Sequence, residues 1–181
     1  MERVANRQVE EAIQNFKFEG TLIDTRPYGS GHINDTYLLT FEIASMGRMK
    51  VILQRMNKQI FTKPEELMEN IIGVTSYLRE KIIENGGDPD RETLNLIPTV
   101  GEKPYYIDSK GDYWRSYIFI TDATSYDQVE KPEDFYQSAV AFGNFQRLLS
   151  DYPAGTLHET IQGFHDTKAR FQTFREAVKK D

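Results

Sequence analysis

The sequence contains no cysteine, only three histidines and no long apolar run. Without cysteine the chain forms no disulfide, has no thiol for catalysis and offers no cysteine-based zinc site. Its apolar runs are too short for a membrane-spanning helix, and the first residues, MERVANRQVEEAI, lack the apolar centre of a signal peptide. We therefore expect a cytoplasmic protein that does not associate with membranes.

Positive charge is also in deficit, with 22 Lys and Arg against 28 Asp and Glu and a net charge of -6. Nucleic-acid binding depends largely on Lys and Arg contacts to phosphates, so nucleic acid is not expected as the main partner. A local basic site for one anionic ligand is still compatible with this composition. The 39% of hydrophobic residues are enough for a packed core, and 181 residues suit one domain or a smaller domain with an appendage.

The apolar spacing predicts an α+β fold. Residues 4–16 have helical periodicity, whereas residues 20–27, 33–43 and 49–56 read as three successive strands. Short turns between consecutive strands predict an antiparallel meander, and we expect a sheet of about five strands.

A long helix is predicted over residues 62–85. Thr62 and Glu65 have the spacing of a capping box, and Pro64 suits a first helical turn. Its buried stripe is expected to comprise Leu67, Ile71, Val74, Leu78 and Ile82. Further strands are expected at 93–99, 104–108 and 112–120, followed by helices at 132–150 and at the C-terminus, where the sequence stops inside the helical pattern.

A glycine-containing segment, YGSGHINDTY (residues 28–37), lies between the first two predicted strands. Gly29 and Gly31 suit a tight hairpin turn, because glycine adopts positive φ without steric cost. They equally suit a loop whose backbone closely approaches a phosphate. The segment itself does not decide between these interpretations.

The order of elements resembles the N-terminal lobe of the protein-kinase-like fold, in its aminoglycoside phosphotransferase branch. YGSGHINDTY and VILQRMNKQIFTKPEELMENI (residues 51–71) together resemble the N-terminal part of the N-acetylhexosamine 1-kinases. The resemblance implies an ATP-dependent sugar kinase that phosphorylates the anomeric hydroxyl of an N-acetylhexosamine. It also implies a nucleotide-binding lobe over 1–123, with a helical connector and the start of a C-terminal lobe over 124–181.

The resemblance implies a set of nucleotide-binding residues. Kinases of this kind place a lysine on the third strand, but here Gln54 and Arg55 stand near that position. Strand alternation puts them on opposite faces; the resemblance favours Gln54, and charge favours Arg55. Glu69 is the expected partner carboxylate, with Glu65 and Glu66 as alternatives. The full expected set is Gly29, Ser30, Gly31, His32, Ile33, Asn34, Gln54, Arg55, Glu69, Ile120, Thr121 and Asp122, the last three as an adenine-binding hinge.

Catalytic residues are not assigned in this sequence. Kinases of this fold draw a catalytic aspartate and the Mg²⁺ ligands from the C-terminal lobe, and no H-x-D segment followed by asparagine occurs here. We interpret His165 and Asp166 as a loop and helix N-cap. These 181 residues alone are therefore expected to be inactive, and to self-associate through apolar surface that a second lobe would cover.

Two alternatives come from other functional classes. A non-catalytic nucleotide-binding or protein-binding module of the same fold would lack the phosphate-facing cation, which the ambiguity between Gln54 and Arg55 leaves open. Proteins of this kind are also associated with mucin desulfation. A sulfatase needs a C/S-x-P-x-R segment, and the sequence contains none.

Overall fold

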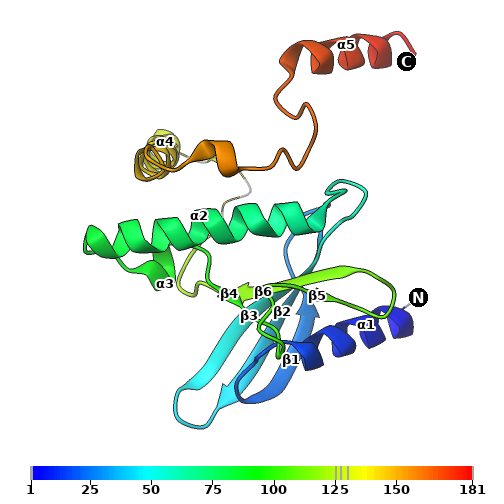
Figure 1. Cartoon of the computed structure of the whole chain (residues 1–181), viewed down its shortest axis with the longest axis vertical. Coiled ribbons are helices and arrows are strands. Elements are labelled where there is room, and N and C mark those ends of the chain that lie inside the picture. The colour runs from blue at the N-terminus through cyan, green and yellow to red at the C-terminus, as the bar shows by residue number, and fades with distance from the viewer. Residues whose placement is uncertain (1, 125, 127, 130, 181) are drawn as a thin grey trace.

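The structure is a computed structural model that describes residues 2–124, 126, 128–129 and 131–180, with side chains from residue 7 onward. These residues form an α+β fold with five α-helices and an antiparallel sheet of six strands, one more than expected. In Figure 1 the sheet lies between α1 (Glu2–Asn15) and α2 (Pro64–Glu84). The helices α4 (Pro132–Leu148) and α5 (Thr167–Val178) lie beyond α2, away from the sheet.

The predicted antiparallel meander is confirmed. It consists of β1 (Thr21–Pro27), β2 (Asp35–Ile43) and β3 (Gly47–Arg55), and the full order of the sheet is β1-β2-β3-β6-β4. The strand β6 (Tyr113–Ile118) also pairs with β5 (Tyr106–Ile107). Both β4 (Leu96–Ile97) and β5 are shorter than predicted. Pro98 follows β4 and Pro104 precedes β5, and proline cannot donate a hydrogen bond to a neighbouring strand.

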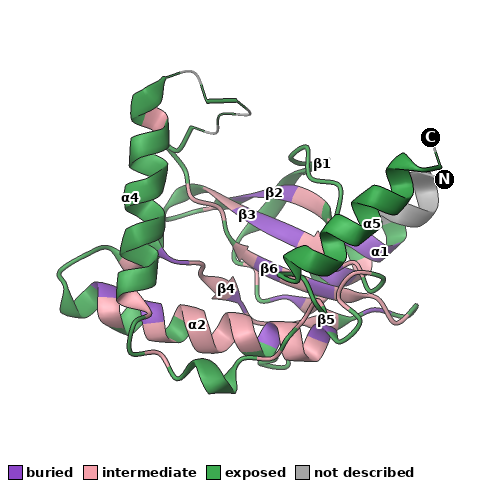
Figure 2. Cartoon of the chain, turned by 90° about the horizontal axis from the view of Figure 1, so that it is seen from above, coloured by how far each residue is buried: buried purple, intermediate pink, exposed green. Residues whose placement is uncertain are grey.

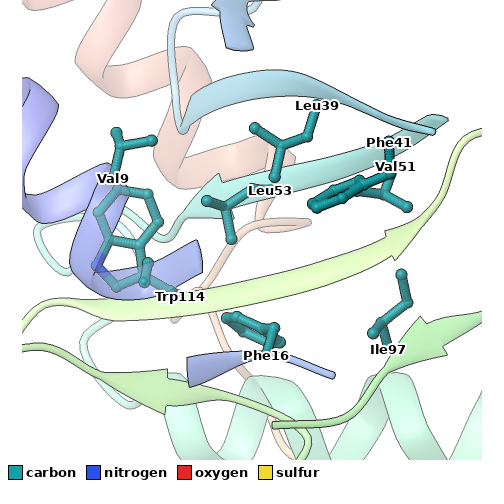
Figure 3. Close-up of a cluster of buried hydrophobic side chains, with 9 residues drawn as sticks. Val9, Phe16, Leu39, Phe41, Val51, Leu53, Ile97 and Trp114 are labelled. Atoms are coloured by element: carbon teal, nitrogen blue, oxygen red, sulfur yellow. The ribbon is translucent and has the colours of Figure 1, made fainter. Parts of the chain in front are cut away.

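The main core lies between α1 and one face of the sheet. Alternating residues of β2 and β3 point to this face, as the period of two predicts. Figure 3 shows the indole ring of Trp114 among aliphatic and aromatic side chains from four elements. The buried cluster comprises Val9, Ala12, Phe16, Leu39, Phe41, Val51, Leu53, Ile97 and Trp114. Each large side chain of this set contributes roughly 1.5–3 kcal/mol through burial.

The long helix α2 was predicted correctly, but its cap was not. Lys63 occupies the N-cap position without a side-chain cap, and Pro64 begins the first turn. The Glu65 carboxylate instead accepts a hydrogen bond from the Tyr113 hydroxyl, so the expected capping box does not form. The predicted buried stripe is confirmed at Leu78 and Ile82. In the first half of the helix Pro64 and Met68 are buried instead, and Leu67, Ile71 and Val74 are half-buried.

The C-terminal part is helical, as predicted, and contacts α2 through a short segment. Tyr152 packs edge-to-face on Tyr77, with ring centroids 5.2 Å apart. The Asn70 side chain exchanges two hydrogen bonds of 2.9 Å with the backbone of His158. Asp166 caps α5 by accepting from the Ala169 amide at 2.9 Å, which confirms its predicted role. α3 (Pro89–Glu92) follows α2 as a single turn.

Candidate functional site

A hollow of about 370 Å³ lies where the β1–β2 loop faces the segment after β6. Its volume falls within the usual range of small-molecule sites, which begins at about 300 Å³. The lining residues are Tyr28, Gly29, Gly31, Thr36, Ile52, Leu94, Tyr117, Ile118, Phe119, Ile120 and Ala123. The sheet therefore supplies an apolar floor, while the loop and the connector supply mostly backbone.

The loop is anchored at its base and open at its tip. The Tyr28 amide donates to the Thr36 carbonyl at 2.9 Å, and the Tyr28 ring packs edge-to-face on Phe119. Gly29 has a φ of +84°, which explains the glycine there by backbone conformation alone. Gly31 has no such φ, and a Cβ at this position would meet no heavy atom within 4 Å. Nothing in the described residues requires glycine at 31, so the space in front of it is available to a ligand.

The connector leaves backbone groups available at the edge of the hollow. The Phe119 amide donates to the Lys50 carbonyl at 3.1 Å, and the Thr121 carbonyl accepts from the Arg91 guanidinium at 3.1 Å. Between them, the amide and carbonyl of Ile120 make no hydrogen bond to any described residue. Asp122 has a φ of +55°, in the left-handed region. A planar ring in the hollow could pair with the Ile120 backbone.

Gln54 lies on the same face of the sheet as the hollow. Its strand neighbour two residues earlier, Ile52, lines the hollow, and Thr36 lies opposite Gln54 on β2. The Gln54 amide nitrogen donates to the Thr36 hydroxyl at 2.9 Å, and its amide oxygen accepts from Arg115 at 2.7 and 3.0 Å. Arg115 was not among the residues that the sequence predicts for this site, because its pairing with Gln54 spans 61 positions.

Arg55 lies on the opposite face, which carries Trp114. Its guanidinium is ion-paired with Asp35, lies 3.3 Å from a carboxylate oxygen of Asp112, and stacks over the Trp114 ring at 6.0 Å. Burial opposes the charge of Arg55, but the hydrogen bond and charge of Asp35 outweigh it and raise the pKa. The alternative in which Arg55 faces the phosphates therefore has no support in the geometry.

The remaining predicted residues of the loop do not line one common hollow. His32 and Ile33 line a separate polar hollow of about 390 Å³ beside Arg55 and Asp112. The Asn34 side chain accepts from the Asn57 amide at 2.9 Å, and Ser30 is exposed. These positions leave the loop tip between the two hollows.

Glu69 does not contact the strand residues that it was expected to serve. Its carboxylate lies 2.7 Å from Nε2 of His158, in the segment that docks on α2. The Nδ1 atom of the same ring is 3.9 Å from Glu66. Sequence reasoning missed this contact, because His158 lies 89 positions away.

A larger hollow, about 640 Å³, lies between α2 and β4 and shares Leu94 and Ile118 with the candidate site. Its arginine, Arg79, is already engaged by Asp90 at 3.0 Å and Asn95 at 2.7 Å. We therefore place the candidate site in the smaller hollow, where the loop and connector backbone converge.

No family model matches the chain. Among the described residues no helix is both long and apolar enough to cross a membrane. In the same part of the chain, no three His, Asp or Glu side chains come together in a group that could hold a metal ion.

Proposed function

We propose that residues 1–123 form the nucleotide-binding lobe of an ATP-dependent kinase that phosphorylates the anomeric hydroxyl of an N-acetylhexosamine. Residues 124–181 would then connect this lobe to a second one. The observation that carries the proposal is the hollow between the glycine loop and the connector, with its apolar floor and the Ile120 backbone, which hydrogen-bonds to no described residue. The resemblance of residues 28–37 and 51–71 to the N-acetylhexosamine 1-kinases supports the choice of substrates.

The hollow suits a nucleotide chemically. Ile52 and Leu94 would pack against the faces of an adenine ring, and the Ile120 amide and carbonyl would pair with its edge. The phosphates would then extend towards residues 29–31, which are exposed and lack a side chain at two of three positions. Backbone N–H groups are effective phosphate ligands because they carry partial positive charge without a bulky side chain.

Catalysis itself is assigned to no residue of this chain. Phosphoryl transfer in this fold requires an aspartate near the acceptor hydroxyl and carboxylates for Mg²⁺. The described residues do not fit a magnesium site, since no group of three acidic or histidine side chains is assembled. We therefore expect the 181-residue chain alone to form no sugar 1-phosphate from ATP and N-acetylglucosamine or N-acetylgalactosamine. Measurable turnover would contradict that expectation.

Nucleotide binding is the direct test of the proposal. Isothermal titration of the 181-residue chain with ATP is expected to show binding, and Gly31→Val is expected to weaken it roughly tenfold or more. A side chain at 31 would enter the ligand space without disturbing the protein, because no described atom lies within 4 Å of a Cβ there. Gly155→Val is the matched control, since Gly155 is equally open and lies outside the site. Absent ATP binding, or equal binding by both variants, would overturn the proposal.

A non-catalytic protein-binding module is the second candidate, and one observation favours it. The strand position expected to carry a cation holds the neutral Gln54, while Arg55 is committed to two carboxylates. Magnesium-dependent ATP binding would favour the kinase interpretation. A melting temperature that no nucleotide changes would favour the module.

A further inference from the structure

Arg115 is a partly buried cation that is held by a neutral partner. It lies opposite Gln54 in the β3–β6 register, two residue pairs along from Ile52 and Tyr117, which line the hollow. Its chain neighbours Trp114 and Ser116 are buried on the other face of the sheet. Strand alternation therefore places the Arg115 side chain on the face of the candidate site.

The guanidinium lacks a counter-charge among the described residues. Nε and Nη2 both donate to the Gln54 amide oxygen, at 3.0 and 2.7 Å, and no described carboxylate lies within 4.0 Å. Burial lowers the pKa of Arg115 below its ordinary value. The pKa of Arg55 is raised instead, because the Asp35 carboxylate outweighs the effect of burial there. A desolvated charge without an opposite charge is costly, and an anionic ligand would offset that cost.

The orientation of the guanidinium is fixed from the far side. Gln54 donates to the Thr36 hydroxyl at 2.9 Å, which directs its amide oxygen towards Arg115. The resulting line of Thr36, Gln54 and Arg115 crosses three strands. The third guanidinium nitrogen, Nη1, has no hydrogen-bond partner among the described residues. Because no side-chain nitrogen or oxygen of these residues is both buried and without a partner, Nη1 is accessible to solvent. Because Gln54 is neutral, it orients the guanidinium of Arg115 without cancelling its charge.

We propose that Arg115 is the cation that binds the phosphates of a nucleotide in the hollow, supplied from β6 instead of β3. This inference rests on the proposed function. In this arrangement Gln54 is a positioning residue, and the guanidinium offers N–H groups to phosphate oxygens in the planar geometry that favours such pairs. The proposal explains how the site manages without a lysine on β3.

The test compares ligands with and without phosphates. Isothermal titration is carried out with adenosine, ADP, ATP and inorganic tripolyphosphate. For the unaltered chain, affinity is expected to rise from adenosine to ATP. Arg115→Met is expected to weaken ATP binding roughly ten- to hundredfold, because hydrogen bonds to charged groups contribute about 1.5–3 kcal/mol. Adenosine affinity should be unchanged.

A second variant keeps the arginine and removes its free charge. Gln54→Glu is nearly isosteric and supplies a carboxylate at the oxygen to which Arg115 already donates, so it should also weaken ATP binding while leaving adenosine affinity unchanged. Arg48→Met is the matched control, because it removes one exposed positive charge at the distant end of β3. Its ATP affinity should equal that of the unaltered chain. Circular dichroism confirms that each variant is folded.

The outcomes separate this inference from the proposed function. If the chain binds adenosine and ATP, and both Arg115→Met and Gln54→Glu retain full ATP affinity, the role of Arg115 is wrong and the nucleotide site stands. If no nucleoside or nucleotide binds but tripolyphosphate binds through Arg115, the anion site stands and the nucleotide function fails. If neither ATP nor tripolyphosphate binds to the unaltered chain, both are overturned.

Discussion

Asp108 shows how a single buried carboxylate organises the end of the sheet. One oxygen accepts from Gln8 at 2.8 Å and from the Trp114 indole at 2.9 Å. The other accepts from the backbone amides of Lys110 and Asp112, at 2.8 and 2.9 Å. Burial opposes the charge of this carboxylate, but the hydrogen bonds, led by that of Trp114, outweigh it and lower its pKa. The charged form is therefore the one that the fold stabilises.

The stability of the protein should accordingly depend on this ionisation. A pKa lower in the folded state gives a contribution that is present above the unfolded value, about 3.9, and is lost as the pH falls through the folded value. Asp108→Asn should lower the free energy of unfolding by about 1–3 kcal/mol at neutral pH, since an amide nitrogen would face N–H donors. Urea unfolding should show this difference shrinking as the pH falls below about 4. Asp151→Asn, at an exposed site, is the control; a difference that is independent of pH would contradict the assignment.

At the scale of elements, the hairpins of the sheet depend on two glycines for different reasons. Gly20, before β1, has a φ of +85°, and a Cβ there would lie 2.3 Å from the Glu42 carbonyl oxygen. Gly47, at the start of β3, has a φ of +79°, and a Cβ there would meet nothing within 4 Å. Both positions carry the same backbone constraint, but only the first has a steric one.

Alanine substitutions separate the two effects. Gly47→Ala is expected to cost about 1–2 kcal/mol, the usual penalty for a side chain in the left-handed region. Gly20→Ala should cost roughly a further 1–3 kcal/mol, because its Cβ would displace the backbone of β2. Free energies of unfolding from urea titrations measure both costs. Equal losses in the two variants would mean that the β1–β2 hairpin relaxes freely around position 20.

Local patterns predicted the elements better than the contacts between them. Alternation was sufficient for β2 and β3, because each of these strands has one face against the α1 core. β1 is exposed along its length and is held by its pairing with β2. It overestimated β4 and β5, where flanking prolines limit pairing. The cap of α2 depended on Tyr113, which competes for Glu65 from a distant strand. In the site, the loop could be recognised from its glycines, whereas the partners of Gln54 and Glu69, Arg115 and His158, follow only from the tertiary fold.

At the scale of the whole molecule, the two C-terminal helices leave apolar side chains uncovered. No described residue of α4 or α5 is buried, and Figure 2 shows both helices almost entirely in the colour of exposed residues. Phe135 and Phe142 on α4 are 67% and 69% exposed. They are seven residues apart, so they lie on one face of the helix. Contiguous apolar surface of this kind favours association with another protein surface.

We therefore predict that the 181-residue chain self-associates through α4. Sedimentation velocity over a range of concentrations should show reversible oligomers, because burying the aromatic rings of two copies against each other removes apolar area from water. The double substitution of Phe135→Ser and Phe142→Ser should raise the dissociation constant roughly tenfold or more, since aromatic anchors often contribute over about 1 kcal/mol each. Met46→Ser is the control, because Met46 is 77% exposed but lies in the β2–β3 turn. A monomer at every concentration, or association that survives the double substitution, would show that α4 is not the contact surface.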